Sequence, residues 1–250
     1  MSEAIVVSDL GINFHVNRRG RRRRKRQFRD LFRPGGSQDS SRLFWALRHV
    51  NFTLNHGEAV GIVGGNGSGK STLLRLIAGV MLPDEGNVRV NGGVGAMLEL
   101  SAGFVPSLTA RDNVYLLSAL HGFSREQVDE RFDEIVKWAE VDEFVDSQIR
   151  HFSSGMKARL AFSVVTRLEE PILLVDEILA VGDRAFRRKC SGVMENMLAD
   201  GRTLLLVSHN ERDLRRLCTR GLYVRDGTVV ADGPIAEILE MYDADSDREQ

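Results

Sequence analysis

The chain has 250 residues, of which 42% are hydrophobic and 28% charged, as is ordinary for a soluble globular protein. No apolar stretch approaches the roughly 20 residues of a membrane-spanning helix, and the acidic N-terminus with its short apolar run does not fit a signal peptide. Two cysteines without metal-ligand spacing, Cys190 and Cys218, indicate a reducing cytosolic compartment.

The net charge of −1 hides a strong asymmetry. Ten arginines or lysines and one acid, Asp30, lie between Arg18 and Arg33, whereas the rest of the chain has 24 basic and 34 acidic residues. A block of this kind is either an interaction arm or a solvated tail.

The first quarter of the chain reads as β-structure. Residues 5–7, 12–16, 43–47 and 50–54 have the apolar content or the alternation of strands. The basic run and the Gly- and Ser-containing residues 35–41 separate the two pairs and predict a flexible linker. We therefore expect an antiparallel β layer that is interrupted by a basic insert at 18–41.

A phosphate-binding P-loop follows at residues 64–72, GGNGSGKST, between an apolar strand (59–63) and a helix. Gly64, Gly67 and Gly69 allow the backbone N–H groups to approach phosphate oxygens. Lys70 is expected to reach the β- and γ-phosphates, and Ser71 to place a hydroxyl on a magnesium ion. A glycine-rich turn without ligand is the alternative, but the strand and helix that the motif requires are both present.

Past a turn at 83–86 and a short strand at 87–90, the periodicity becomes helical from Thr109 onward. Thr109 with Asp112 and Ser124 with Gln127 are typical of capping boxes at two helix starts. We expect one domain over residues 1–250: mostly antiparallel β at 1–60, a helical subdomain at about 99–160, and the rest of the core at 161–240.

Two buried strands end in polar residues. Residues 171–175 lead to Asp176 and Glu177, and residues 204–207 lead to Ser208 and His209. Because ligands bind at the carboxyl ends of parallel strands, Asp176 is expected to hold magnesium and Glu177 to deprotonate the attacking water. Two acids could instead cap the next helix, and His209, expected at the γ-phosphate, could simply cap a strand.

Asp183 lies in a turn and could connect the site to a neighbouring subunit or be a plain turn residue. A Ser-Ser-Gly turn at 153–155 opens another helix and offers a second anion site, although this signal is weak alone. A hairpin at 223–230, a helix at 234–242 and a polar, frayed tail complete the expected elements.

The segments GGNGSGKST, FSSGM, ILLVDE, AVGD and VSH, in this order and spacing, resemble the ATP-binding subunits of ABC transporters over essentially the whole chain. The stretches FWALRHVNF, LELSAGFVPSLTARDNV and LLVDEILAVGDRAF resemble one branch of that family. This branch exports lipid-linked polysaccharides such as O-antigens, teichoic acids, capsules and galactan.

The resemblance implies an α/β fold of the P-loop NTPase, ABC ATPase type, with a RecA-like core, an antiparallel β layer and an inserted helical subdomain. It implies ATP and Mg²⁺ as ligands and a homodimer that sandwiches ATP. The implied catalytic residues are Glu177 and His209, and the implied interface residue is Asp183. The implied ATP-binding residues are Phe14, Gly64, Asn66, Gly67, Gly69, Lys70, Ser71 and Thr72. The signature acting from the other subunit is Ser153, Ser154, Gly155 and Met156, and the metal ligands are Ser71, Asp176 and Glu99.

Two positions stay open. Most relatives have a glutamine before the helical subdomain, where this chain has Glu99 followed by Leu100. The aromatic residue that stacks on adenine is Phe14 in our interpretation, with Phe44 and Trp45 as alternatives.

The resemblance further implies a separate membrane permease, which delivers the lipid-linked polysaccharide, and a peripheral position on the cytoplasmic face of the inner (plasma) membrane. The basic insert is expected to contact anionic lipid, and no nucleic acid is expected. The alternative is a soluble ABC-type ATPase that grips nucleic acid through its Arg-rich arm. A non-enzymatic, nucleotide-gated scaffold is disfavoured by the intact set Lys70, Asp176 and Glu177.

Overall fold

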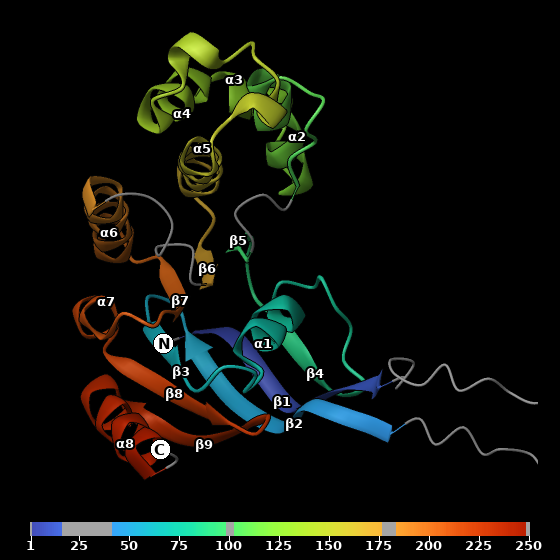
Figure 1. Ribbon diagram of the computed structural model, residues 1–250, viewed down its shortest axis with the longest axis vertical. Helices are drawn as coiled ribbons and strands as arrows, with labels where there is room; N and C mark the ends of the chain where they lie inside the picture. The colour runs from blue at the N-terminus through green and yellow to red at the C-terminus, as the bar shows by residue number, and fades with distance from the viewer. Residues whose placement is uncertain (1, 17–41, 99–102, 177–183, 249–250) are drawn as a thin grey trace, which may run out of the picture.

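The computed structural model describes residues 2–16, 42–98, 103–176 and 184–248 (Figure 1). One sheet has three antiparallel strands in the order β2-β1-β4. These strands are β1 (Glu3–Val16), β2 (Arg42–Asn55) and β4 (Glu85–Val90).

The second sheet has six strands in the order β5-β6-β7-β3-β8-β9 and is parallel except for the β8–β9 hairpin. Its strands are β3 (Ala59–Val63), β5 (Val94–Met97), β6 (Ile172–Asp176), β7 (Thr203–Val207), β8 (Arg220–Arg225) and β9 (Thr228–Pro234). Strand β7 lies between β3 and β6, and all three strands are parallel. The P-loop after β3 and Asp176 at the end of β6 therefore lie at the same edge of the sheet, separated by one strand.

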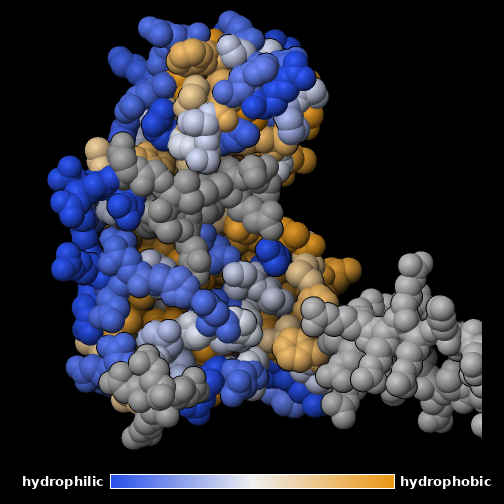
Figure 2. Space-filling view, in the orientation of Figure 1, coloured by the Kyte–Doolittle hydropathy of each residue, from blue (hydrophilic) through white to orange (hydrophobic). Residues whose placement is uncertain are grey.

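The helices divide into an upper group and a lower group in Figure 1. The upper group contains α2 (Ala110–Leu120), α3 (Arg125–Asp129), α4 (Phe132–Ala139), α5 (Ser154–Arg167) and the short 3₁₀ turns Asp142–Phe144 and Ile149–His151. The lower group contains α1 (Lys70–Ile77), α6 (Arg184–Ala199), α7 (Glu211–Leu217) and α8 (Ile235–Arg248). The space-filling view shows hydrophilic residues on the left-hand side and hydrophobic residues on the right-hand side of the waist between the groups (Figure 2).

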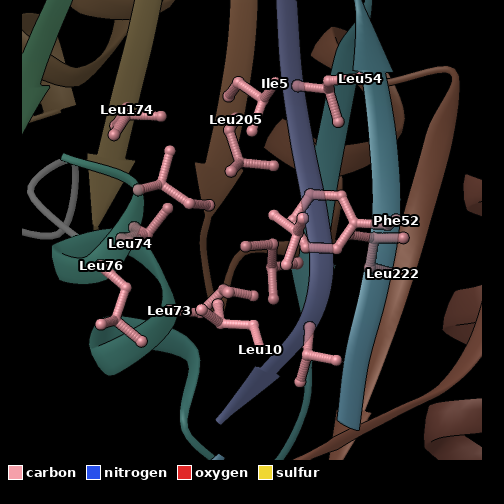
Figure 3. Close-up of a cluster of buried hydrophobic side chains, with 14 of the residues drawn as sticks. Ile5, Leu10, Phe52, Leu54, Leu73, Leu74, Leu76, Leu174, Leu205 and Leu222 are labelled. Carbon is pink, nitrogen blue, oxygen red and sulfur yellow. The ribbon is translucent and has the colours of Figure 1, made fainter. Parts of the chain in front are cut away.

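Three hydrophobic clusters hold these layers together. One joins α1 and one face of the parallel sheet to the antiparallel layer, with Leu73, Leu174 and Leu10 as representatives (Figure 3). A second packs α5, α6, α7 and α8 on the other face of the parallel sheet. A third lies within the upper helices. The apolar runs predicted as buried strands, β3, β6 and β7, are buried along their whole length.

The antiparallel layer has two long strands where the sequence predicted four short ones. Asp9 and His49 adopt positive φ angles of 47° and 54°, and the ladder shifts register around them. The Nδ1 atom of His49 lies 2.7 Å from Oδ1 of Asp9, and the Asp9 N–H donates to Asn51. These hydrogen bonds stabilise the irregular backbone at Asp9 and His49, which lie opposite each other in β1 and β2. Each strand therefore continues past the point where its alternation of apolar and polar residues is interrupted.

Both predicted capping boxes are confirmed. Thr109 and Asp112 cap α2, and Ser124 and Gln127 cap α3. The predicted end of the last helix is wrong, because α8 continues beyond Tyr242 to Arg248. Asp245 on this last part pairs with Arg225 and accepts a hydrogen bond from the Tyr223 hydroxyl, and such tertiary contacts do not show in local sequence.

None of the helices in the described ranges is long and apolar enough to cross a membrane.

Candidate active site

The P-loop connects β3 to α1 and requires its glycines. Gly64 and Gly69 have φ angles of 155° and 107°, a region that favours glycine. A Cβ atom on Gly64 would lie 2.1 Å from the carbonyl oxygen of Val224, and one on Gly69 would lie 2.6 Å from the Leu47 side chain. Any other residue would therefore move the loop away from β8 and β2.

Lys70 spans the loop from the first turn of α1. Its ammonium donates to the carbonyl oxygens of Gly64 and Gly65, at 2.8 Å each, and the residue is 7% exposed. Gly69, the N-cap of α1, provides no side chain to accept from the first-turn N–H groups. Those N–H groups, the positive end of the helix dipole and the ammonium together suit an anion such as a phosphate.

A cavity of about 310 Å³ lies beside the loop. Its lining combines loop residues with aromatic residues from the antiparallel layer: Phe14, Phe44, Ala46, Asn66, Gly67, Gly69, Lys70, Ser71 and Thr72. Phe14 and Phe44 face each other across β1 and β2 and are 41% and 55% exposed. An apolar, aromatic end and a cationic end in one cavity match a nucleobase and its phosphates.

Trp45, the third candidate for the stacking aromatic, does not line this cavity. It is next to Phe44 on a strand, where successive side chains point to opposite faces. Its ring packs against Gly11, and the guanidinium of Arg48 lies 4.5 Å from the ring centroid. The candidates for the aromatic residue that stacks on adenine are therefore Phe14 and Phe44.

Asp176 is the last residue of β6 and is 8% exposed. Strand β6 contacts α1, which carries Ser71 in its first turn. A hydroxyl and a carboxylate are the hard oxygen ligands that Mg²⁺ takes beside nucleotide phosphates. Across the residues that the structure describes, no group of three His, Cys, Asp or Glu side chains is arranged to hold a metal ion.

The Ser-Ser-Gly turn lies at the start of α5, in the upper group of helices. The Ser153 hydroxyl accepts a hydrogen bond of 3.2 Å from the Met156 N–H and so caps the helix. Ser153 and Ser154 are exposed, and Gly155 and Met156 are partly exposed. No residue of this turn is among the described residues that line the P-loop cavity. Within one chain, the structure does not bring the two anion-binding turns together.

His209 is exposed and follows β7, between Ser208 and Asn210. The Ser208 hydroxyl accepts from the Asn210 N–H at 3.0 Å, and the Asn210 side chain caps α7. Since β7 pairs with β3, His209 lies at the sheet edge from which the P-loop starts. The predicted Glu99, Glu177 and Asp183, and the alternative Leu100, lie outside the described residues.

Sequence reasoning missed a second, larger cavity of about 670 Å³ between α1, β5 and the end of α2. Glu170 and His121 line it, and neither belongs to a motif. The one feature of the sequence that could have pointed to this cavity is the charged residue Glu170 immediately before the apolar run of β6. Both cysteines are buried, and burial raises the pKa of Cys190 and Cys218 to about 12, so neither thiol forms a reactive thiolate near neutral pH.

Comparison with known proteins places these features in a family context. A family model described as ABC transporter matches residues 47–180. The chain is 44% identical over 201 residues to the O-antigen export system ATP-binding protein RfbB of Klebsiella pneumoniae, covering 80% of this chain and 82% of that protein. It is 38% identical over 199 residues to the teichoic acids export ATP-binding protein TagH of Bacillus anthracis, covering 80% and 36%.

The fold is similar to that of a solved ATP-binding cassette, MJ0796, in a dimeric post-hydrolysis state bound to ADP and Pi. The TM-score is 0.74 at 23% identity, over 92% of this chain and 98% of that one. The α/β fold with a parallel sheet, an antiparallel layer and a helical group is therefore the one that the sequence predicted.

Proposed function

Because the chain belongs to the ABC transporter family of ATP-binding proteins, we propose that it is the ATP-hydrolysing subunit of an exporter of lipid-linked polysaccharide. Relatives that it matches are named for the export of O-antigen and of teichoic acids, and the proposal assigns this chain a cargo of the same class. The observation that supports ATP binding most directly is the P-loop cavity, which has Lys70 at its cationic end and Phe14 and Phe44 at its aromatic end.

ATP binds with its phosphates on the P-loop and its base against Phe14 or Phe44. Lys70 leaves the carbonyl groups of Gly64 and Gly65 to pair with phosphate oxygens, and the N–H groups of the loop and of α1 complete the cradle. Ser71 and Asp176 would hold Mg²⁺, with Glu99 as a further candidate ligand. When bound, the ion neutralises charge on the phosphates.

Hydrolysis transfers the γ-phosphoryl group to water and gives ADP and inorganic phosphate. Glu177, which follows Asp176 at the end of β6, accepts a proton from the attacking water. His209 contacts the γ-phosphate from the end of the neighbouring strand β7. Asp183 communicates between subunits.

The signature turn Ser153, Ser154, Gly155 and Met156 closes over ATP that is bound by a second copy of the chain. The exposure of the turn, and its absence from the lining of the P-loop cavity of its own chain, support this arrangement among the described residues. Two copies related by a twofold axis then enclose two ATP molecules.

The homodimer docks on a separate membrane permease from the cytoplasmic face of the plasma membrane. The basic segment 18–33 contacts anionic lipid there, at about 1 kcal/mol for each basic residue near the surface. The nucleic-acid alternative draws no support from the relatives above, whose names refer to export.

The general-base role is tested with Glu177→Gln. The substitution keeps the shape of the side chain but removes the proton acceptor, so hydrolysis should fall by at least about 100-fold. ATP affinity should remain within about twofold of wild type, because phosphate binding belongs to the P-loop. Phosphate release and nucleotide titration measure the two quantities.

Glu130→Gln, which changes an exposed carboxylate of the helical group, is the matched control and should hydrolyse ATP like the wild type. Hydrolysis by Glu177→Gln at the control's rate would contradict the assignment of the base. Absence of hydrolysis by the wild type itself, with its permease, would contradict the proposed function.

A further inference from the structure

A third cavity, of about 180 Å³, lies between the P-loop and the C-terminal helix α8. Residues 65–68 of the loop, the end of β8 and the last turns of α8 form its lining. Asn66 and Gly67 also line the nucleotide cavity beside the loop. One stretch of the loop therefore borders the proposed phosphate site as well as the cavity next to α8.

Side chains do not fill the space behind this stretch of the loop. Ser68 is 8% exposed, and its buried hydroxyl has no hydrogen-bond partner among the described residues. A Cβ atom on Gly65 or on Gly67 would meet nothing within 4 Å. The cavity has polar walls and room for several water molecules. The position of residues 65–68 therefore depends on a few contacts and not on close packing.

Backbone contacts with the turn between β8 and β9 hold the loop in place. The Gly227 N–H donates to the Ser68 carbonyl oxygen at 3.2 Å, and the Gly227 carbonyl oxygen accepts from the Arg48 N–H at 2.9 Å. Gly64 lies so close to Val224 that a Cβ atom on it would be 2.1 Å from that carbonyl oxygen. The end of β8 therefore determines where the loop lies.

The end of β8 is fixed in turn by α8, which packs on β8 and β9 (Figure 1). Asp245 forms an ion pair with Arg225 and accepts a hydrogen bond of 3.2 Å from the Tyr223 hydroxyl. The Tyr223 ring meets the Tyr242 ring edge-on, with centroids 5.8 Å apart. The Asp245 side chain is 25% exposed, so salt screens this pair less than a fully exposed one. Contacts thus continue from Asp245 through the end of β8 to the P-loop.

We propose that Asp245 is a positioning residue for the P-loop, because it holds the end of β8 and so keeps residues 65–68 in the geometry that receives phosphate. A loop that already has the bound geometry loses less conformational entropy when the ligand binds, and its affinity is higher. The identity of that ligand as ATP rests on the proposed function.

The order of the strands confines the effect to nucleotide binding. Strand β8 lies next to β3 on the side away from β7 and β6, which lead to His209 and Asp176. Loss of the contact at Asp245 should therefore weaken nucleotide binding and leave kcat unchanged. A merely stabilising contact would act in the opposite way, since its loss lowers the folded fraction and the apparent kcat at an unchanged Kd.

The test reverses the charge in Asp245→Lys, which places two cations side by side. Helix α8 should tolerate the change, because a basic residue suits the C-terminal end of a helix. Titration of the full chain with Mg-ADP should give a Kd at least about fivefold above that of the wild type. In steady-state hydrolysis KM should rise in parallel, and kcat should stay within about twofold of the wild-type value.

Asp243→Lys is the matched control, since it makes the same charge change at an exposed position of the same helix. It should bind Mg-ADP like the wild type. The double variant Asp245→Lys with Arg225→Glu rebuilds the ion pair with its charges exchanged, and its Kd should return to within about twofold of the wild-type value. Thermal denaturation checks that each variant is folded at the temperature of the titration.

An Asp245→Lys protein with the Kd of the control, or a double variant that binds no more tightly than Asp245→Lys, would overturn the proposal. A lower kcat at an unchanged Kd would overturn it as well. These outcomes compare variants with a wild type that binds nucleotide, so they are distinct from a wild type that does not hydrolyse ATP, which would contradict the proposed function.

Discussion

The side-chain amide of Asn113 binds the loop that leads into α2. It is fully buried in α2, and its Nδ2 donates to the carbonyl oxygens of Val105, Leu108 and Thr109 at 2.7–3.2 Å. Its Oδ1 accepts from the Val105 N–H at 2.7 Å. One side chain thus adds four hydrogen bonds to the few backbone bonds that hold the loop before α2, such as those from Leu108 N–H to Val105 and from Ile149 N–H to Leu108.

Asn113→Ala should lower the free energy of unfolding by about 1–3 kcal/mol, because it removes the four hydrogen bonds of a fully buried side chain and leaves the Val105 N–H without its acceptor. Asn196→Ala, at an exposed position of α6, should change it by less than about 0.5 kcal/mol. Urea denaturation of both variants measures the difference. Equal stability of the two variants would show that the loop does not depend on this amide.

The residues proposed to bind phosphate could be read from the sequence, whereas those proposed to bind the nucleobase could be read only in part. A phosphate requires glycines and a lysine in a fixed order, so Lys70 and Ser71 can be read from the motif. The choice between Phe14, Phe44 and Trp45 depends on the register of β1 and β2. Asp9 and His49 shift that register through side chains 40 residues apart, which no local pattern reveals.

At the scale of elements, the end of α4 is joined to α6. The Lys189 ammonium donates to the Trp138 carbonyl oxygen at 2.8 Å and to Glu140 at 2.9 Å, and lies 4.5 Å from the Trp138 ring centroid. The same ring stacks on Phe162 of α5 at 5.1 Å and meets Phe186 of α6 edge-on. The contact therefore connects the helix of the signature turn to the helix that follows residues 177–183.

Lys189→Met should lower the free energy of unfolding by about 1–2 kcal/mol, because the Trp138 carbonyl at the end of α4 loses its ammonium donor and the Trp138 ring loses the nearer of its two cation–π partners. We also expect a lower kcat at unchanged ATP affinity, since Glu177 and Asp183 precede α6 in the chain. Thermal denaturation, steady-state hydrolysis and nucleotide titration measure the three quantities.

Arg188→Met is the control for this change, because Arg188 is exposed on α6 beside Lys189. The two variants should differ in stability and in kcat. A Lys189→Met protein with the stability and turnover of the control would show that the contact is incidental.

For the whole molecule, the arrangement of layers followed from the sequence better than the lengths of their elements. Continuous apolar runs predicted β3, β6 and β7 as buried parallel strands, because both faces of such a sheet are covered. The end of α8 was not predictable, because Asp245 on this helix is held by Tyr223 and Arg225 of strand β8. The order of strands places the P-loop and Asp176 at one sheet edge and leaves the signature turn on the helical group.

This separation predicts that dimerisation depends on both ATP and Gly155. In Glu177→Gln, unhydrolysed ATP should hold two copies together, and the molecular mass by light scattering should double when Mg-ATP is added. Gly155→Asp on this background should remain a monomer that still binds ATP, because its carboxylate would face the γ-phosphate of the partner copy. A Cβ on Gly155 meets only the Ser153 hydroxyl, at 3.8 Å, and an acidic residue in the first turn suits the dipole of α5, so the fold should be retained.

Gly192→Asp, on α6 with nothing near its Cβ, is the control and should dimerise like the parent. Dimerisation of the Gly155→Asp variant at the same ATP concentration would contradict a site shared between two chains.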